Sequence, residues 1–203
     1  MGRFLMTSSP ADQITAYIAR FATPPAPQVQ GFVAEARRTV IGRGNPLVDL
    51  GNTTHPLYFV HSGIIRYLLI VPETGDDVTK DFSAGPTFAM SFGSAVSGQP
   101  ARVGIMAVTD CVVSVWPFVR LTGLYASHAE WQKLGRVLAE RLYIRKEDRE
   151  IAFLTQSPEQ RYANLVQALP DLIAQVPQMH IASYLGITPE SLSRLKARVA
   201  GRV

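Results

Sequence analysis

Hydrophobic residues at the start of the chain recur at the spacing of a helix. Ile14, Tyr17, Ile18 and Phe21 predict a helix over residues 10–22. Three prolines within residues 24–27 cannot continue that helix and predict a stiff turn. A second helical segment is expected over residues 29–38. Both segments are interpreted as packing for the part of the chain that follows.

Between residues 39 and 116 the pattern changes to short strands separated by turn signals. The expected strands cover residues 57–60, 64–71, 78–82, 103–108 and 111–116. Breaks fall at Ser62-Gly63 and at the hairpin tip Pro72–Asp77. Short strands with turns this frequent are typical of an antiparallel sandwich or barrel.

A long helix is expected next, over residues 117–153. One face carries an apolar series at helical spacing: Trp131, Leu134, Leu138 and Leu142. Gly135 lies beside this series, where a missing side chain would let a neighbouring helix come close. We favour a dimer seam formed by two such helices. The alternative is that the series packs on the chain's own sandwich.

The stretch from Val176 to Arg198 predicts two short helices joined by a tight turn. Ile181 and Leu185 share one face of the first helix. Gly186 ends this helix, because only glycine turns so sharply without a Cβ clash. Thr188 then supplies an N-cap oxygen and Pro189 the first helical position.

The second helix of this pair has an apolar face and a polar face. The apolar positions, expected to face the core, are Leu192, Leu195 and Val199. The opposite stripe has the same period and consists of Glu190 or Ser191, Arg194 and Arg198. Arginine can bind guanine O6 and N7 together, and glutamate can accept a hydrogen bond from cytosine N4. The pair is therefore predicted to be a helix-turn-helix that enters the major groove.

Composition supports this interpretation. The chain has 203 residues, 47% hydrophobic and 18% charged, which is enough to bury a core. Its formal net charge is +4, and basic residues gather near its end, namely Arg194, Lys196, Arg198 and Arg202, as expected for contact with a polyanion. The single cysteine, Cys111, is expected to be a small buried residue. With no signal peptide and no apolar segment long enough to cross a bilayer, we expect a cytoplasmic protein.

The order of strands, long helix and helix-turn-helix resembles the Crp/Fnr superfamily of transcription regulators. The segments that carry the resemblance are the strand–glycine–strand signature Tyr58–Arg66, the segment Ser157–Tyr162 and the segment Val176–Arg194. The resemblance implies an α+β fold in three parts. These are N-terminal helices with an antiparallel, jelly-roll-like β-roll (residues 1–116), a long dimerisation helix (117–155) and a small helix-turn-helix domain (156–203).

The resemblance also assigns roles to the last helix. The implied base readers are Glu190, Ser191 and Arg194, and the residues nearer the phosphates are Thr188, Lys196 and Arg198. Pro189 stands where many members carry a basic residue, so the preferred site should differ from theirs. Two such helices in a two-fold dimer predict a near-palindromic operator. The implied partners are double-stranded DNA, a second copy of the chain, RNA polymerase and a small anionic effector, with no membrane.

The effector pocket departs from the family pattern. Members that bind cyclic nucleotides use a glutamate for the ribose and an Arg-Ser or Arg-Thr pair for the phosphate. Between Asp81 and Asp110 this chain has no acidic residue, and Val103 replaces the hydroxyl residue. Arg102 remains to meet an anion, with an ordinary rim arginine as the alternative. We expect that cyclic AMP is not bound in the usual way and leave the effector unknown. The candidate pocket residues are Phe88, Ser91, Phe92, Arg102 and Val103.

Other chemistries find little support. Cys111 alone cannot hold an iron–sulfur cluster, and the four histidines form no recognisable haem motif. No catalytic triad, metal-ligand spacing or phosphate loop is evident, so we expect neither an enzyme nor a cofactor. The alternative to a regulator is a ligand-binding or interaction module of the same fold that no longer binds DNA specifically.

Overall fold

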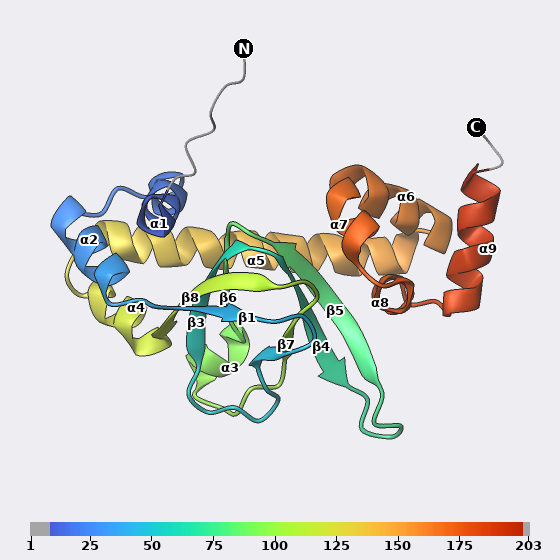
Figure 1. Ribbon diagram of the computed structural model, residues 1–203, viewed down its shortest axis with the longest axis horizontal. Helices are drawn as coiled ribbons and strands as arrows, with labels where there is room; N and C mark the ends of the chain where they lie inside the picture. The colour runs from blue at the N-terminus through green and yellow to red at the C-terminus, as the bar shows by residue number, and fades with distance from the viewer. Residues whose placement is uncertain (1–8, 201–203) are drawn as a thin grey trace, which may run out of the picture.

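Helix α5 (Ala129–Thr155) runs along the whole molecule, and the other elements are arranged on it (Figure 1). The computed structural model describes residues 9–200, without the side chains of Val199 and Ala200. The predicted core position of Val199 and the basic residue Arg202 thus lie outside the described part. None of the described helices is long and apolar enough to cross a membrane.

Three helices gather at one end of α5: α1 (Pro10–Ala19), α2 (Ala26–Ala34) and α4 (Phe118–Tyr125) (Figure 1). Ser9 caps α1 by accepting a hydrogen bond from the amide of Asp12 at 3.1 Å. The expected second helix begins earlier than predicted, because Pro27 is tolerated in its first turn. It also ends earlier, since Arg37 already starts a strand.

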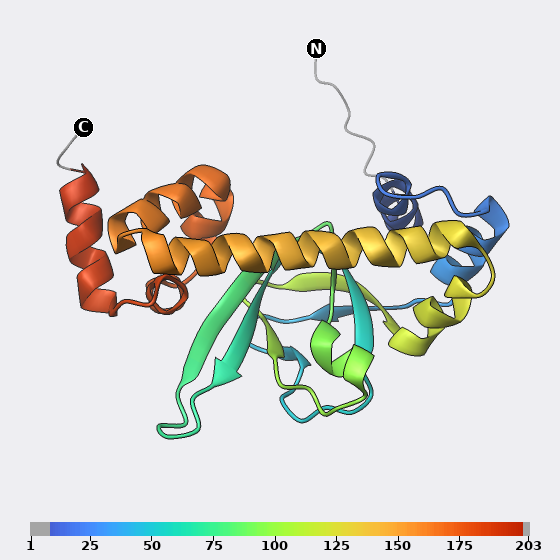
Figure 2. The same ribbon diagram turned by 180° about the vertical axis from the view of Figure 1, so that it is seen from behind.

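The strands form two antiparallel four-stranded sheets that face each other, as the strand pattern predicts. The first has the order β1 (Arg37–Ile41), β8 (Cys111–Pro117), β3 (Pro56–Ser62) and β6 (Thr87–Ala89). The second has the order β2 (Pro46–Val48), β7 (Gly104–Ala107), β4 (Ile64–Ile70) and β5 (Asp77–Ala84). Between them lies a core cluster that includes Val60, Ile65, Ile105, Cys111 and Val113. Helix α3 (Phe92–Ser97) follows β6 on the side seen in Figure 2.

Gly63 explains the strand–glycine–strand signature. Its φ is +102°, and a Cβ there would lie 2.5 Å from the carbonyl oxygen of Asp110. The neighbouring Cys111 is fully buried, as predicted, and burial raises the pKa of its thiol to about 11. The thiol is therefore protonated at neutral pH.

Most of the apolar series on α5 packs within the protomer's own core, which favours the alternative to a dimer seam for Trp131, Leu134 and Leu138. Trp131 and Leu134 are buried within a cluster shared with α1, α2 and α4, and Leu138 packs against it. Gly135 does allow a close approach, but the approaching group is the ring of Tyr125, whose Cζ would lie 2.8 Å from an added Cβ. Leu142 lines a cavity between α5 and the roll. Sequence spacing therefore identified the apolar face of α5, but only the packing of the neighbouring strands and helices shows what this face contacts.

The C-terminal helices are α6 (Pro158–Ala168), α7 (Pro170–Gln175), α8 (Gln178–Leu185) and α9 (Pro189–Ala200). Ser157 and Gln160 form a capping box at the start of α6. The four C-terminal helices share one core, formed by Tyr162, Leu165, Leu172, Val176, Ile181, Leu185, Leu192 and Leu195. The same cluster includes Ile64 and Phe82 of the roll. The helical domain is therefore packed directly against the roll.

Candidate nucleic-acid interface and effector cavity

The turn between α8 and α9 has the caps that the sequence predicts. Gly186 adopts the left-handed conformation with φ +70°, and a Cβ there would lie 2.9 Å from Cε1 of Phe153. The amide of Ser191 donates to Thr188 Oγ1 at 3.2 Å, so Thr188 caps α9. This turn sets α9 apart from α8 at the end of the molecule (Figure 1).

Helix α9 buries one face and exposes the other. Leu192 and Leu195 are buried, as predicted. The predicted DNA-contacting residues that are exposed are Thr188, Pro189, Glu190, Arg194 and Arg198, and those that are half-buried are Ser191 and Lys196. All seven predicted residues are thus at least partly exposed.

Local contacts divide this surface into a centre and two flanks. Lys196 Nζ donates to Gln178 Oε1 on α8 at 3.0 Å, and Arg198 pairs with Glu159 on α6 at 2.7 Å. At the centre, Arg194 Nη2 lies 3.3 Å from Ser191 Oγ. Hydrogen bonds from its own backbone amide and from Thr188, together with the charge of Arg194, lower the pKa of Glu190. Glu190 is thus a carboxylate, an acceptor only, at neutral pH.

Two arginines fix the C-terminal end of α8. Arg149 of α5 donates to the carbonyl of Tyr184 at 3.1 Å, and Arg161 of α6 donates to that of Leu185 at 2.9 Å. Both guanidinium groups lie over the ring of Phe153, at 4.7 and 4.5 Å from its centroid. The last carbonyls of a helix lack partners within it and carry its negative end, so these cations satisfy them. The sequence interpretation had missed this contact, because Arg149 lies in the mixed-charge run Arg145–Glu150, a composition typical of a solvated helix face.

Strand β5 holds the other side of α8. The amide of Thr79 donates to Ser183 Oγ at 2.8 Å. Beside this bond Arg66, only 1% exposed, binds both carboxylate oxygens of Asp77 at 2.7 and 2.6 Å. The hydrogen bond from Arg66 lowers the pKa of Asp77, whereas burial and then the charge of Arg66 lower the pKa of His180 on α8. Helix α8 is therefore anchored to both the long helix and the roll.

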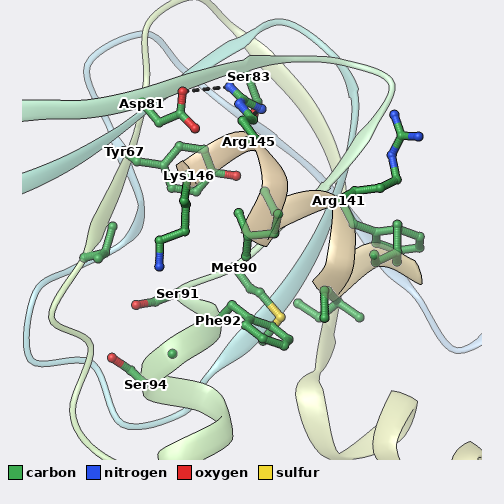
Figure 3. Close-up of a pocket in the computed structure, with 18 of the residues that line it drawn as sticks. Tyr67, Asp81, Ser83, Met90, Ser91, Phe92, Ser94, Arg141, Arg145 and Lys146 are labelled. Carbon is green, nitrogen blue, oxygen red and sulfur yellow. Dashed lines mark hydrogen bonds and ion pairs between the residues drawn. The ribbon is translucent and has the colours of Figure 1, made fainter. Parts of the chain in front are cut away.

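A cavity of about 1040 Å³ separates α5 from the roll. It brings together all five predicted pocket residues, namely Phe88, Ser91, Phe92, Arg102 and Val103. Figure 3 shows its two sides, with Ser91, Phe92 and Ser94 on the roll side and Arg141, Arg145 and Lys146 on α5. The size is at the upper end of the range for small-molecule sites.

Some of the charged side chains in the cavity lie outside the segment between Asp81 and Asp110, where the family pattern places the effector-binding residues. Carboxylates are present after all, from Asp81 on β5 and Asp148 on α5. Asp81 pairs with Arg145 at 2.7 Å. Burial raises the pKa of the nearby Tyr67 to about 12, so its hydroxyl remains a donor at neutral pH.

Sequence reasoning missed Arg145 and Lys146 because they begin the mixed-charge run of α5. A helical signal was nevertheless present: Leu138, Leu142, Arg145 and Arg149 follow one another at helical spacing. The stripe that begins as apolar continues as basic. Both parts of it face the body of the chain.

No protein-family profile and no curated protein sequence matches this chain. Solved structures do resemble it. FixK2 from Bradyrhizobium japonicum gives a TM-score of 0.69 at 17% identity, covering 82% of this chain and 85% of that one. CLP from Xanthomonas campestris, a c-di-GMP responsive global regulator, gives 0.67 at 16% identity, covering 88% of this chain and 93% of that one.

A protein from Eubacterium rectale described as a transcriptional regulator of the Crp/Fnr family gives a TM-score of 0.71 at 15% identity. The match covers 88% of this chain and 85% of that one. Each of the three matches covers more than four fifths of both chains. The chain has the fold of the Crp/Fnr transcription regulators.

Proposed function

We propose that this protein is a dimeric DNA-binding transcription regulator that reads a near-palindromic operator through α9. The observation that carries the proposal is the two-faced helix α9. Its apolar side is buried by Leu192 and Leu195, while Glu190 and Arg194 stand exposed on the other side. A helix presented in this way can enter the major groove with its N-terminal half.

Each exposed residue has a role that fits its chemistry. Arg194 is suited to guanine, and the ionised Glu190 to the amino group of cytosine. Thr188, Lys196 and Arg198 lie at the start and flanks of α9, where phosphates would pass. Arg198 would exchange its contact with Glu159, an exposed pair that contributes little to stability, for a phosphate.

The dimer is assigned to an exposed stripe of α5 beside the cavities that this helix forms with the roll. Val137, Ile144 and Ile151 follow one another at heptad spacing on this face, and Leu154 continues it. Ile144, Ile151 and Leu154 are 54%, 51% and 79% exposed. A second copy of α5 packed on this stripe would bury it and would place two α9 helices about one turn of DNA apart, roughly 34–36 Å. The three parts 1–116, 117–155 and 156–203 are proposed as effector, dimerisation and DNA-binding regions.

Selection from a pool of random duplex DNA tests the proposal. We expect the selected DNA sequence to be near-palindromic, and the affinity of the protein for it to fall as the salt concentration rises. Arg194→Ala should lose about 1–3 kcal/mol at one base pair in each half-site and relax specificity there. Arg43→Ala, which removes an exposed positive charge from the roll, is the matched control and should leave the selected sequence unchanged.

Sequence-blind, salt-sensitive binding by the unaltered protein would contradict the proposal. Function would then lie in the roll, as in a ligand-binding module that no longer binds DNA specifically. A uniform loss of affinity for all sequences in Arg194→Ala would instead make Arg194 a phosphate contact.

A further inference from the structure

The cavity between α5 and the roll is lined by more basic than acidic side chains. The cations that line it are Lys80, Arg102, Arg141, Arg145 and Lys146. Among the described residues, only Arg145 of this set forms an ion pair. The opposing carboxylates are Asp81, which takes part in that pair, and Asp148. Burial, and then the charges of Lys146, Arg149 and Arg145, lower the pKa of Lys80, whereas Asp81 raises it.

Ser91 places a hydroxyl group on the roll side of the same cavity. It holds the N-cap position of α3, where a serine side chain normally accepts a hydrogen bond from the helix, yet it makes no such bond. Ser91 as a residue is only 7% exposed, and its side chain lines the cavity. Figure 3 shows this hydroxyl in the cavity, with the ammonium group of Lys146 directed toward it.

The rest of the cavity beside Ser91 is apolar. Met90 and Phe92 lie next to Ser91 (Figure 3), and Leu138 and Leu142 of α5 also line the space. Arg102 is exposed at the rim, and its backbone amide is already bound to Ser94 Oγ at 3.1 Å. Figure 3 shows Lys146 of α5 directed toward Ser91, so the long helix supplies a cation beside this hydroxyl in addition to the roll residue that the sequence suggests.

We infer that this cavity binds a small organic acid, with its anionic head between Lys146 and Ser91 and its apolar body against Met90 and Phe92. An ammonium and a hydroxyl together donate to one acidic group, and the apolar wall excludes a fully hydrophilic ion. A ligand held in this way bridges α5 and the roll, and α5 also carries Arg149, which holds α8. The inference rests on the proposed function, because such a ligand would act as the effector.

The test is a fluorescence titration of the full chain with two probes that share the same rings. Anilinonaphthalene sulfonate carries an acidic group, whereas N-phenylnaphthylamine is uncharged. We expect the sulfonate to bind more tightly, and Lys146→Gln to weaken it by about tenfold while leaving the uncharged probe unchanged. Ser91→Ala should weaken the sulfonate severalfold. The Ser91→Ala variant should fold normally, since the Ser91 side chain caps no helix amide in the unaltered protein.

Lys133→Gln is the matched control, because Lys133 lies on the same helix outside the cavity and binds Glu130 at 3.3 Å. It should bind both probes as the unaltered protein does. Decanoate should displace the sulfonate, whereas inorganic phosphate at the same concentration should not. Equal effects of Lys146→Gln on both probes, an equal loss in Lys133→Gln, or displacement by inorganic phosphate alone would each overturn the inference. No DNA is present in this titration, so its failure is distinct from failure of the operator selection.

Discussion

Replacing Gly186 by alanine probes the junction between the turn of the helix-turn-helix and the end of α5. Alanine in the left-handed conformation at φ +70° costs about 1–2 kcal/mol. The new Cβ would also lie 2.9 Å from Cε1 of Phe153. That ring lies beneath the guanidinium groups of Arg149 and Arg161, so it can move little without disturbing them. Overpacking of this kind adds about 1 kcal/mol or more. The expected loss in the free energy of unfolding is about 3 kcal/mol.

The assay is equilibrium unfolding in urea, with the change in midpoint read at constant slope. Gly98→Ala is the matched control, because Gly98 also follows a helix with φ +69° but an added Cβ would meet nothing within 4 Å. It should cost only the conformational part, about 1–2 kcal/mol. If Gly186→Ala cost no more than Gly98→Ala, the contact with Phe153 would not restrain the turn, and the reasoning would be refuted.

Three further predictions concern α5 and the two histidines with lowered pKa values. Ile144→Glu should weaken the dimer in analytical ultracentrifugation without lowering protomer stability, whereas an unchanged dissociation constant would remove this face from the seam. Gly135→Ala should do the reverse and destabilise the protomer by about 1–3 kcal/mol, because its Cβ meets the Tyr125 ring; a selective effect on dimerisation would contradict the structure. The lowered pKa values of His61 and His180 mean that the unfolded chain binds more protons below about pH 6.5. The free energy of unfolding should therefore fall as the pH drops below that value, with a smaller slope in His180→Gln; an identical slope would show that His180 contributes nothing.

The sequence by itself determined the features that depend on neighbouring residues. Gly63 and Gly186 mark turns that need glycine, and Thr188 caps α9, because each of these signals acts within a few residues of backbone. The buried side of α9 followed from helical periodicity, since Leu192 and Leu195 lie on one face. The order of these elements was also enough to suggest the fold that the solved structures share.

Only the tertiary structure decided what each face meets. Trp131 lies on an apolar stripe that the sequence interpretation favoured as a seam with a partner helix, whereas the position of α1, α2 and α4 places it in the protomer's own core. Arg149 and Lys146 belong to one charged run, yet one binds the end of α8 and the other faces Ser91. Charge along a sequence does not reveal these partners, because the groups involved are brought together by packing between segments far apart in the chain.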